Sequence, residues 1–173
     1  MERAASVGMV ASCFGSAALA VASLATPSWI VSNFAGSKKL GLVFACRQPT
    51  GFPEWCGAMT NTPREWMVTT CLITAGALVL LGADVCLLLA EWKKNRRFLT
   101  WTKLLAAGGV MFLCLGTLVF PVGFALDEIG GAPYKLPHFM KLGPSFSMFI
   151  ISVFLSIISN FLANKTCERP HFR

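Results

Sequence analysis

Four long runs of apolar residues, separated by shorter polar segments, dominate the sequence. They cover about residues 7–26, 66–90, 104–126 and 144–163. A helix needs about 20 apolar residues to cross the roughly 30 Å hydrocarbon core of a bilayer, and each run is long enough. Backbone polar groups cannot stay unpaired in hydrocarbon, so each run is predicted to be a helix. The pattern therefore predicts one domain over residues 1–173, an all-α membrane bundle of four transmembrane helices.

The first run also resembles a secretory signal peptide, because Arg3 precedes it and residues 20–22 are small. It is longer than the apolar core of about 7–15 residues typical of such peptides, so we expect it to be retained as a transmembrane helix. Small residues recur on it at every fourth position, namely Gly8, Ser12, Ser16 and Ala20. Such a stripe admits another helix of the same chain or of a second copy, so the oligomeric state stays open.

Charged residues are scarce and unevenly distributed. Only 13% of the residues are charged and 55% are hydrophobic, against about 25% charged in soluble domains. The Lys and Arg residues divide between the two sides of the predicted membrane. One side has Arg3, Lys93, Lys94, Arg96, Arg97, Lys103, Lys165, Arg169 and Arg173, and the other has Lys38, Lys39, Arg47, Arg64, Lys135 and Lys141.

The more basic side is predicted to be cytoplasmic by the positive-inside rule. Both termini and a loop over residues 91–103 then face the cytoplasm, and loops of about 27–65 and 127–143 are extracellular. The net charge of +7 fits contact with anionic lipid headgroups of the bilayer. No nucleic-acid-binding motif accompanies this charge, so no nucleic-acid partner is expected.

The first extracellular loop contains Cys46 and Cys56, while the other five cysteines fall in predicted helices or in the cytoplasm. Two thiols in an oxidising compartment predict a disulfide. Their spacing is too wide for a redox pair, and no metal site is expected. The apolar, β-prone residues 39–45 and the turn-forming Pro49 and Pro53 predict a small extracellular β-sheet in this loop.

Asp84 is the one ionisable residue inside the four apolar runs. An acid in this position usually faces a polar partner or water. A polar stripe of Ser152, Ser156 and Asn160 lies at a comparable depth in the fourth run. An interhelical hydrogen bond between Asp84 and this stripe is the favoured interpretation, ahead of contact with a partner's helix. A single acid makes an ion pathway the least favoured interpretation.

In the second extracellular loop, nearby prolines are expected to stiffen an extended, strand-like segment of Tyr134, Lys135 and Leu136. This segment either docks onto a partner or packs against the sheet of the first loop. Trp55, beside Cys56, is a further candidate for partner binding, being either exposed or packed over the disulfide. Cys167 lies beside basic residues at the predicted membrane edge and is a candidate for palmitoylation.

The residues Trp29, Gly41, Leu42, Cys46 and Cys56 resemble the W…GLW…C…C signature of the claudin-like four-helix superfamily. That superfamily includes the claudins, the peripheral myelin protein group and the lipoma-partner-like proteins. Val43 stands where the motif has its second Trp, and the loop is shorter than a claudin's. The resemblance implies a claudin-like fold, with fewer strands and with paracellular sealing disfavoured.

Residues 63–70, 120–124 and 128–137 are similar to the Modulator of Smoothened family, also called attenuators of Hedgehog. That resemblance implies a non-enzymatic membrane adaptor that lowers surface Smoothened. It would act with a large single-pass EGF-repeat receptor and, through it, a cytoplasmic ubiquitin ligase. The implied location is the plasma membrane, with the primary cilium and endosomal membranes as further sites.

Two other functions of the same fold are a cell-junction or adhesion protein and an auxiliary subunit of an ion channel. An enzyme is not expected, because no catalytic constellation of residues and no cofactor motif lies near a membrane face.

Overall fold

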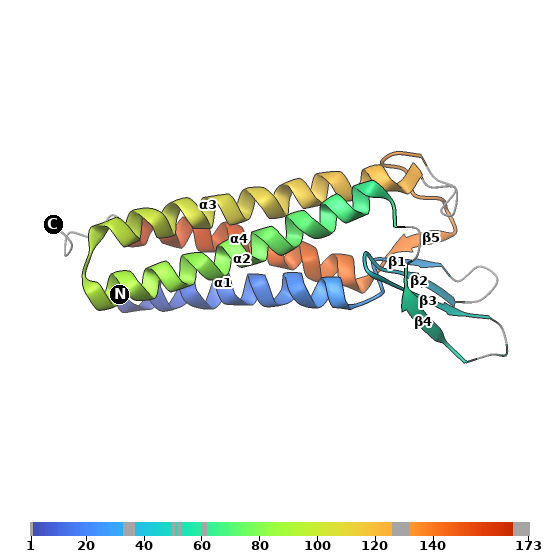
Figure 1. The fold of residues 1–173 in the computed structure, drawn as a ribbon, viewed down its shortest axis with the longest axis horizontal. Coiled ribbons are helices and arrows are strands. Elements are labelled where there is room, and N and C mark those ends of the chain that lie inside the picture. The colour runs from blue at the N-terminus through green and yellow to red at the C-terminus, as the bar shows by residue number, and fades with distance from the viewer. Residues whose placement is uncertain are drawn as a thin grey trace.

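The computed structural model describes residues 2–32, 37–49, 51, 53–59, 62–125 and 132–167, without the side chains of residues 2–5 and 166–167. Four long helices lie side by side in an elongated bundle (Figure 1). They are α1 (Glu2–Ala25), α2 (Arg64–Lys93), α3 (Arg96–Val119) and α4 (Pro144–Cys167). Each is long and apolar enough to cross a membrane, α3 together with the turn that follows it. The prediction of four helices with the length and apolar composition needed to cross a membrane is confirmed.

The helices extend beyond the apolar runs and into the predicted loop over residues 91–103. Only Lys94 and Asn95 separate α2 from α3. Lys94 has a left-handed backbone, with φ 48°, and the Asn95 side chain accepts a hydrogen bond from the backbone N–H of Arg97. The length of an apolar run reflects the thickness of the hydrocarbon core that it crosses. The helical backbone continues beyond that run through the charged residues on either side.

The α-helical part of α3 ends one residue before Phe120, and the chain continues as a 3₁₀-helix, η1 (Phe120–Ala125). Pro121 lies in this segment and has no backbone N–H to donate to the preceding turn.

A five-stranded antiparallel sheet lies at one end of the bundle, which we call the sheet end (Figure 1). Its strands are β1 (Ile30–Ser32), β2 (Ser37–Leu40), β3 (Phe44–Gln48), β4 (Trp55–Ala58) and β5 (Met140–Leu142), in the order β4-β3-β2-β1-β5. The predicted sheet of the first loop is therefore present. It is completed by a strand from the second loop, which the sequence analysis did not place.

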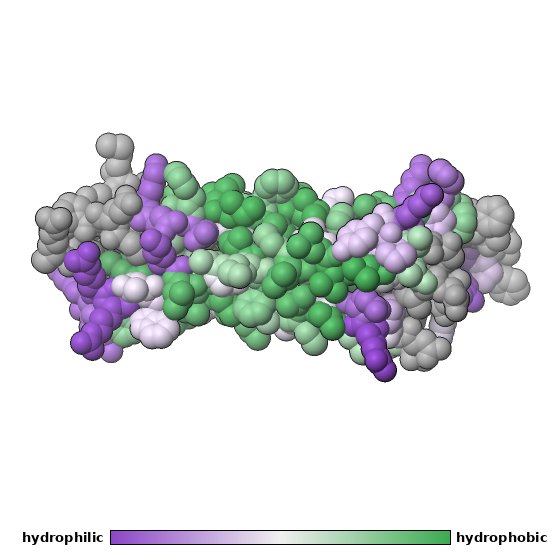
Figure 2. All heavy atoms as spheres, turned by 90° about the horizontal axis from the view of Figure 1, so that it is seen from above, coloured by the Kyte–Doolittle hydropathy of each residue, from purple (hydrophilic) through white to green (hydrophobic). Residues whose placement is uncertain are grey.

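The interior of the bundle is made by close pairs of helices, with α1 along α4 and α2 along α3. The predicted small-residue stripe of α1 faces α4, because a Cβ added at Gly8 would lie 3.5 Å from Leu162 Cδ1. Ser16 and Ser152 each donate a hydrogen bond to the other's backbone carbonyl, both at 2.8 Å. The face of the bundle seen in Figure 2 is apolar in the middle and hydrophilic toward both ends, as expected of a membrane-crossing bundle.

Candidate partner-binding surface at the sheet end

An aromatic cluster joins the sheet to the ends of the helices at the sheet end. Trp29 is fully buried, and its indole Nε1 donates to the Ser23 carbonyl at 2.7 Å. Its ring lies 4.8 Å from the Phe120 ring and 5.3 Å from the Phe149 ring, between centroids. The Trp66 ring stacks on the Phe120 ring, with 5.8 Å between the centroids. These contacts anchor Trp29, the residue before β1, against η1 and α4.

The other two predicted motif residues form the turn between β2 and β3. The Gly41 N–H donates to the Phe44 carbonyl at 2.8 Å, and a Cβ at Gly41 would lie 2.8 Å from Pro27 Cα. Only glycine fits so close an approach of two backbones. Leu42 is buried next to this turn. The motif residues Trp29, Gly41 and Leu42 therefore hold the sheet on the bundle and are not exposed for binding.

The second loop is tied to the first where α1 ends and α4 begins. The Gly143 N–H donates to the Trp29 carbonyl at 2.8 Å, and the Ser145 N–H donates to the Ser28 carbonyl at 3.2 Å. The Ser145 hydroxyl also accepts from the Ser28 N–H at 3.2 Å. Together with the pairing of β5 and β1, these hydrogen bonds make one rigid cap from both loops.

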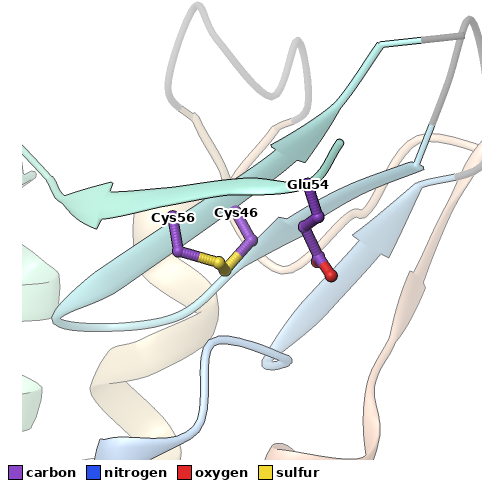
Figure 3. A group of neighbouring side chains, drawn as sticks. All are labelled: Cys46, Glu54 and Cys56. Atoms are coloured by element: carbon purple, nitrogen blue, oxygen red, sulfur yellow. A yellow bond between two sulfur atoms is a disulfide. The ribbon is translucent and has the colours of Figure 1, made fainter. Parts of the chain in front are cut away.

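Cys46 and Cys56 form the predicted disulfide, which joins the adjacent strands β3 and β4. Figure 3 shows Glu54 on the same side of the sheet as the disulfide. Its carboxylate accepts from Lys39 Nζ at 2.9 Å. The two sulfurs bond to each other and are not thiolate ligands, so the Cys46, Glu54 and Cys56 group acts as a covalent link beside an ion pair.

The opposite face of the sheet presents a row of three large side chains. Lys38 on β2 lies directly opposite Arg47 on β3, which lies directly opposite Trp55 on β4. The Trp55 ring lies over Gly57, because a Cβ added there would be 3.1 Å from Trp55 Cη2. The Trp55 side chain is 74% exposed. We call this row, Lys38, Arg47 and Trp55, the Trp55 face.

Of the two predicted placements of Trp55, the exposed one is confirmed. Side chains alternate between the two faces of a strand, so Trp55 and its neighbour Cys56 point to opposite sides. Lys38 and Arg47 were not predicted to be neighbours of Trp55. Only the strand register reveals the row, since the three residues are far apart in sequence.

The segment Tyr134–Leu136 is not the extended strand that the prolines were expected to give. Ala132 and Lys135 form an isolated bridge around a tight turn, and Tyr134 has a positive φ of 62°. The Tyr134 N–H donates to the Pro121 carbonyl at 3.0 Å, so this turn packs against η1. Tyr134 and Lys135 are exposed, while Leu136 is half-buried against the core. Leu136 is therefore a packing residue.

Inside the bundle, the predicted hydrogen bond from Asp84 to the polar stripe of α4 was wrong. Ser152 bonds to Ser16, and the Ser156 hydroxyl donates to the Val153 carbonyl at 2.7 Å. Both Asp84 carboxylate oxygens are buried, and no described residue gives either of them a hydrogen bond of regular geometry. The polar group beside the carboxylate is the Cys13 thiol of α1, which the sequence analysis did not associate with it. The Cys13 thiol in turn bonds to Ser159 of α4.

The remaining two predicted site residues are placed only in part. Asn160 is half-buried on α4, and no hydrogen bond joins it to Asp84. Cys167 is the last residue of α4, and its side chain lies outside the described residues. Palmitoylation of Cys167 stays a prediction.

The bundle and its surface define the class of this chain, a multi-pass membrane protein with four candidate spans and a sheet across one end. Comparison with known families then gives the particular one. The chain belongs to the Attenuator of Hedgehog family, whose sequence profile matches residues 26–169. The match runs from the end of α1 through the sheet and the other three helices. It confirms the resemblance read from residues 63–70, 120–124 and 128–137.

Proposed function

We propose that this chain attenuates Hedgehog signalling as a non-enzymatic membrane adaptor that lowers the amount of Smoothened at the cell surface. Membership of the Attenuator of Hedgehog family is the observation that carries the proposal. In this proposal the sheet is extracellular and both termini are cytoplasmic, as the distribution of Lys and Arg predicts. The protein acts at the plasma membrane, with the primary cilium and endosomal membranes as further sites.

The adaptor role is supported by the distribution of folded structure outside the bundle, which differs between its two ends. At the sheet end the described chain has five strands joined to the helices by Trp29. At the other end, two residues connect α2 to α3. A chain built in this way recognises proteins through its sheet end and needs another protein to modify them. The proposed partners are a large single-pass EGF-repeat receptor and, through it, a ubiquitin ligase.

Deletion of the gene tests the proposal. Surface Smoothened, measured by biotinylation of intact cells, is expected to rise after deletion and to fall again when the wild-type chain is restored. The surface level of an unrelated membrane protein, measured in the same cells, provides the control. An unchanged level of surface Smoothened after deletion would contradict the proposal and leave the fold unaffected.

A further inference from the structure

The Trp55 face contains two positive charges that the described chain does not neutralise. Lys38 and Arg47 lie directly opposite each other on β2 and β3, where like charges destabilise a sheet. Among the described residues, the ion pair of the sheet is Lys39 with Glu54. That pair lies on the disulfide face. Among the described residues no carboxylate neutralises these two cations, so an anion of a partner placed between or beside them would relieve their repulsion.

Trp55 adds an apolar platform to this pair of charges. Its ring is 74% exposed and lies over Gly57, so a large flat apolar surface is accessible next to Arg47. An exposed tryptophan leaves much apolar area in water, and Trp and Arg are the residue types most enriched at the energetic centres of protein interfaces. The lack of a side chain at Gly57 leaves the space that the ring occupies.

The surface is also rigid before anything binds. Arg47 and Trp55 lie on β3 and β4, which the Cys46–Cys56 disulfide joins from the opposite face. At the base of the same face, Ile30 and Leu40 are buried. A surface already held in one conformation loses little entropy when a partner binds.

We infer that the Trp55 face is a docking site for an acidic segment of a protein partner. Two carboxylates of that segment pair with Lys38 and Arg47, and an apolar or aromatic side chain next to them covers Trp55. This inference rests on the proposed adaptor function and specifies the chemistry of the partner. A protein segment fits better than a sulfated polysaccharide, because Lys39 is already paired with Glu54 and the patch has only two free cations beside a large apolar ring.

Photo-crosslinking in intact cells tests the inference. Trp55 is replaced by the photoreactive residue benzoylphenylalanine, and the exposed Ala58 is replaced in the same way as the control. Ala58 lies on the same strand but on the disulfide face, opposite Phe44. We expect position 55, and not position 58, to crosslink to a protein, with the attached peptide rich in Asp and Glu.

Charge reversal provides the second part of the test. The double variant Lys38→Glu with Arg47→Glu is expected to lower the crosslinking yield at position 55 by about tenfold or more, because both attractive pairs become repulsive. Lys141→Glu, an exposed charge on the disulfide face, is the matched control and leaves the yield unchanged. If the double variant does not reach the cell surface, Lys38→Gln with Arg47→Gln replaces it.

Three results would overturn the inference: an unchanged yield in the charge variants, crosslinked peptides without acidic residues, or a signal lost after heparinase treatment. The last result would assign the face to a sulfated polysaccharide. Surface Smoothened, measured in the same cells, separates this inference from the proposed function. If the double variant keeps the wild-type crosslink and lowers surface Smoothened as well as wild type does, the inference fails and the function stands. If the crosslink depends on charge but deletion of the gene leaves surface Smoothened unchanged, the inference stands and the function fails.

Discussion

Asp84 illustrates how much a single residue depends on packing that the sequence does not reveal. Its place within the second apolar run is evident from the sequence, and its burial on α2 is confirmed. Its surroundings could not be predicted, because they depend on how α1 and α4 are rotated about their axes. Those rotations turn Ser152 toward Ser16 and bring Cys13 toward the carboxylate.

Replacing Asp84 is expected to stabilise the bundle. Its carboxylate oxygens are buried without hydrogen bonds of regular geometry, so Asp84→Leu should raise the free energy of unfolding by about 1–3 kcal/mol. Asp84→Asn, which keeps the shape and the polarity, should give a smaller gain. Reversible unfolding in mixed detergent micelles measures both variants. A less stable Asp84→Leu protein would mean that the carboxyl group has a partner, such as a buried water.

Gly123→Ala is expected to destabilise the joint between η1 and α2. A Cβ at this position would overlap the indole ring of the fully buried Trp66, with its Nε1 atom nearest. Overpacking of this kind costs about 1–3 kcal/mol, and the same unfolding measurement would detect it. Gly108→Ala is the matched control, because its Cβ would lie 3.7 Å from Val79 Cγ1, an ordinary contact. Equal stability of the two variants would contradict the described position of Trp66.

At the scale of elements, local sequence predicted the strands of the first loop better than β5. Residues 39–45 are β-prone and are followed by turn formers, and they cover the end of β2 and the start of β3. The turn at residues 41–43 between these two strands was not predicted. The strand β5 has three residues, and its pairing joins Ile30 to Leu142. This pairing forms because the end of α1 lies beside the start of α4. It therefore has no recognisable pattern in the local sequence. The prolines of the second loop instead favoured a strand at Tyr134, where the backbone turns.

Removal of the disulfide is expected to weaken the sheet without affecting the bundle. The bridge closes a segment with a sequence separation of 10, so replacing both Cys46 and Cys56 by Ala should lower the stability of the sheet by about 2–3 kcal/mol. Limited trypsin digestion should then cleave after the exposed Arg47 faster than in wild type. Cys71→Ala, which removes an exposed free thiol on α2, is the control and should leave the digestion rate unchanged.

At the scale of the whole molecule, the number of spans could be predicted from apolar length alone. The hydrocarbon core sets one length for every crossing helix, and all four runs meet it. The cap could not be predicted in the same way, because its shape depends on contacts between both loops and three helices. Its Trp55 face in turn requires the register of three strands.

The predicted orientation can be tested with an added glycosylation site. Gly51→Asn with Pro53→Thr creates an Asn-X-Thr acceptor in the turn between β3 and β4, where Asn tolerates the positive φ of 86°. An extracellular sheet should give a mass increase that glycosidase removes. The natural sequon at Asn164 is expected to stay unmodified in the cytoplasm, so Asn164→Gln should change nothing. A glycosidase-sensitive shift in wild type that Asn164→Gln removes would reverse the orientation.

The hydrogen bonds between Ser28 and Ser145 and between Trp29 and Gly143 have a mechanical consequence. They fasten the first and last helices of the chain together directly beneath the sheet. The serine pair Ser16 and Ser152 fastens the same two helices again farther down. A force applied to the sheet would therefore act on α1 and α4 together. Both helices would transmit it to the end of the bundle opposite the sheet.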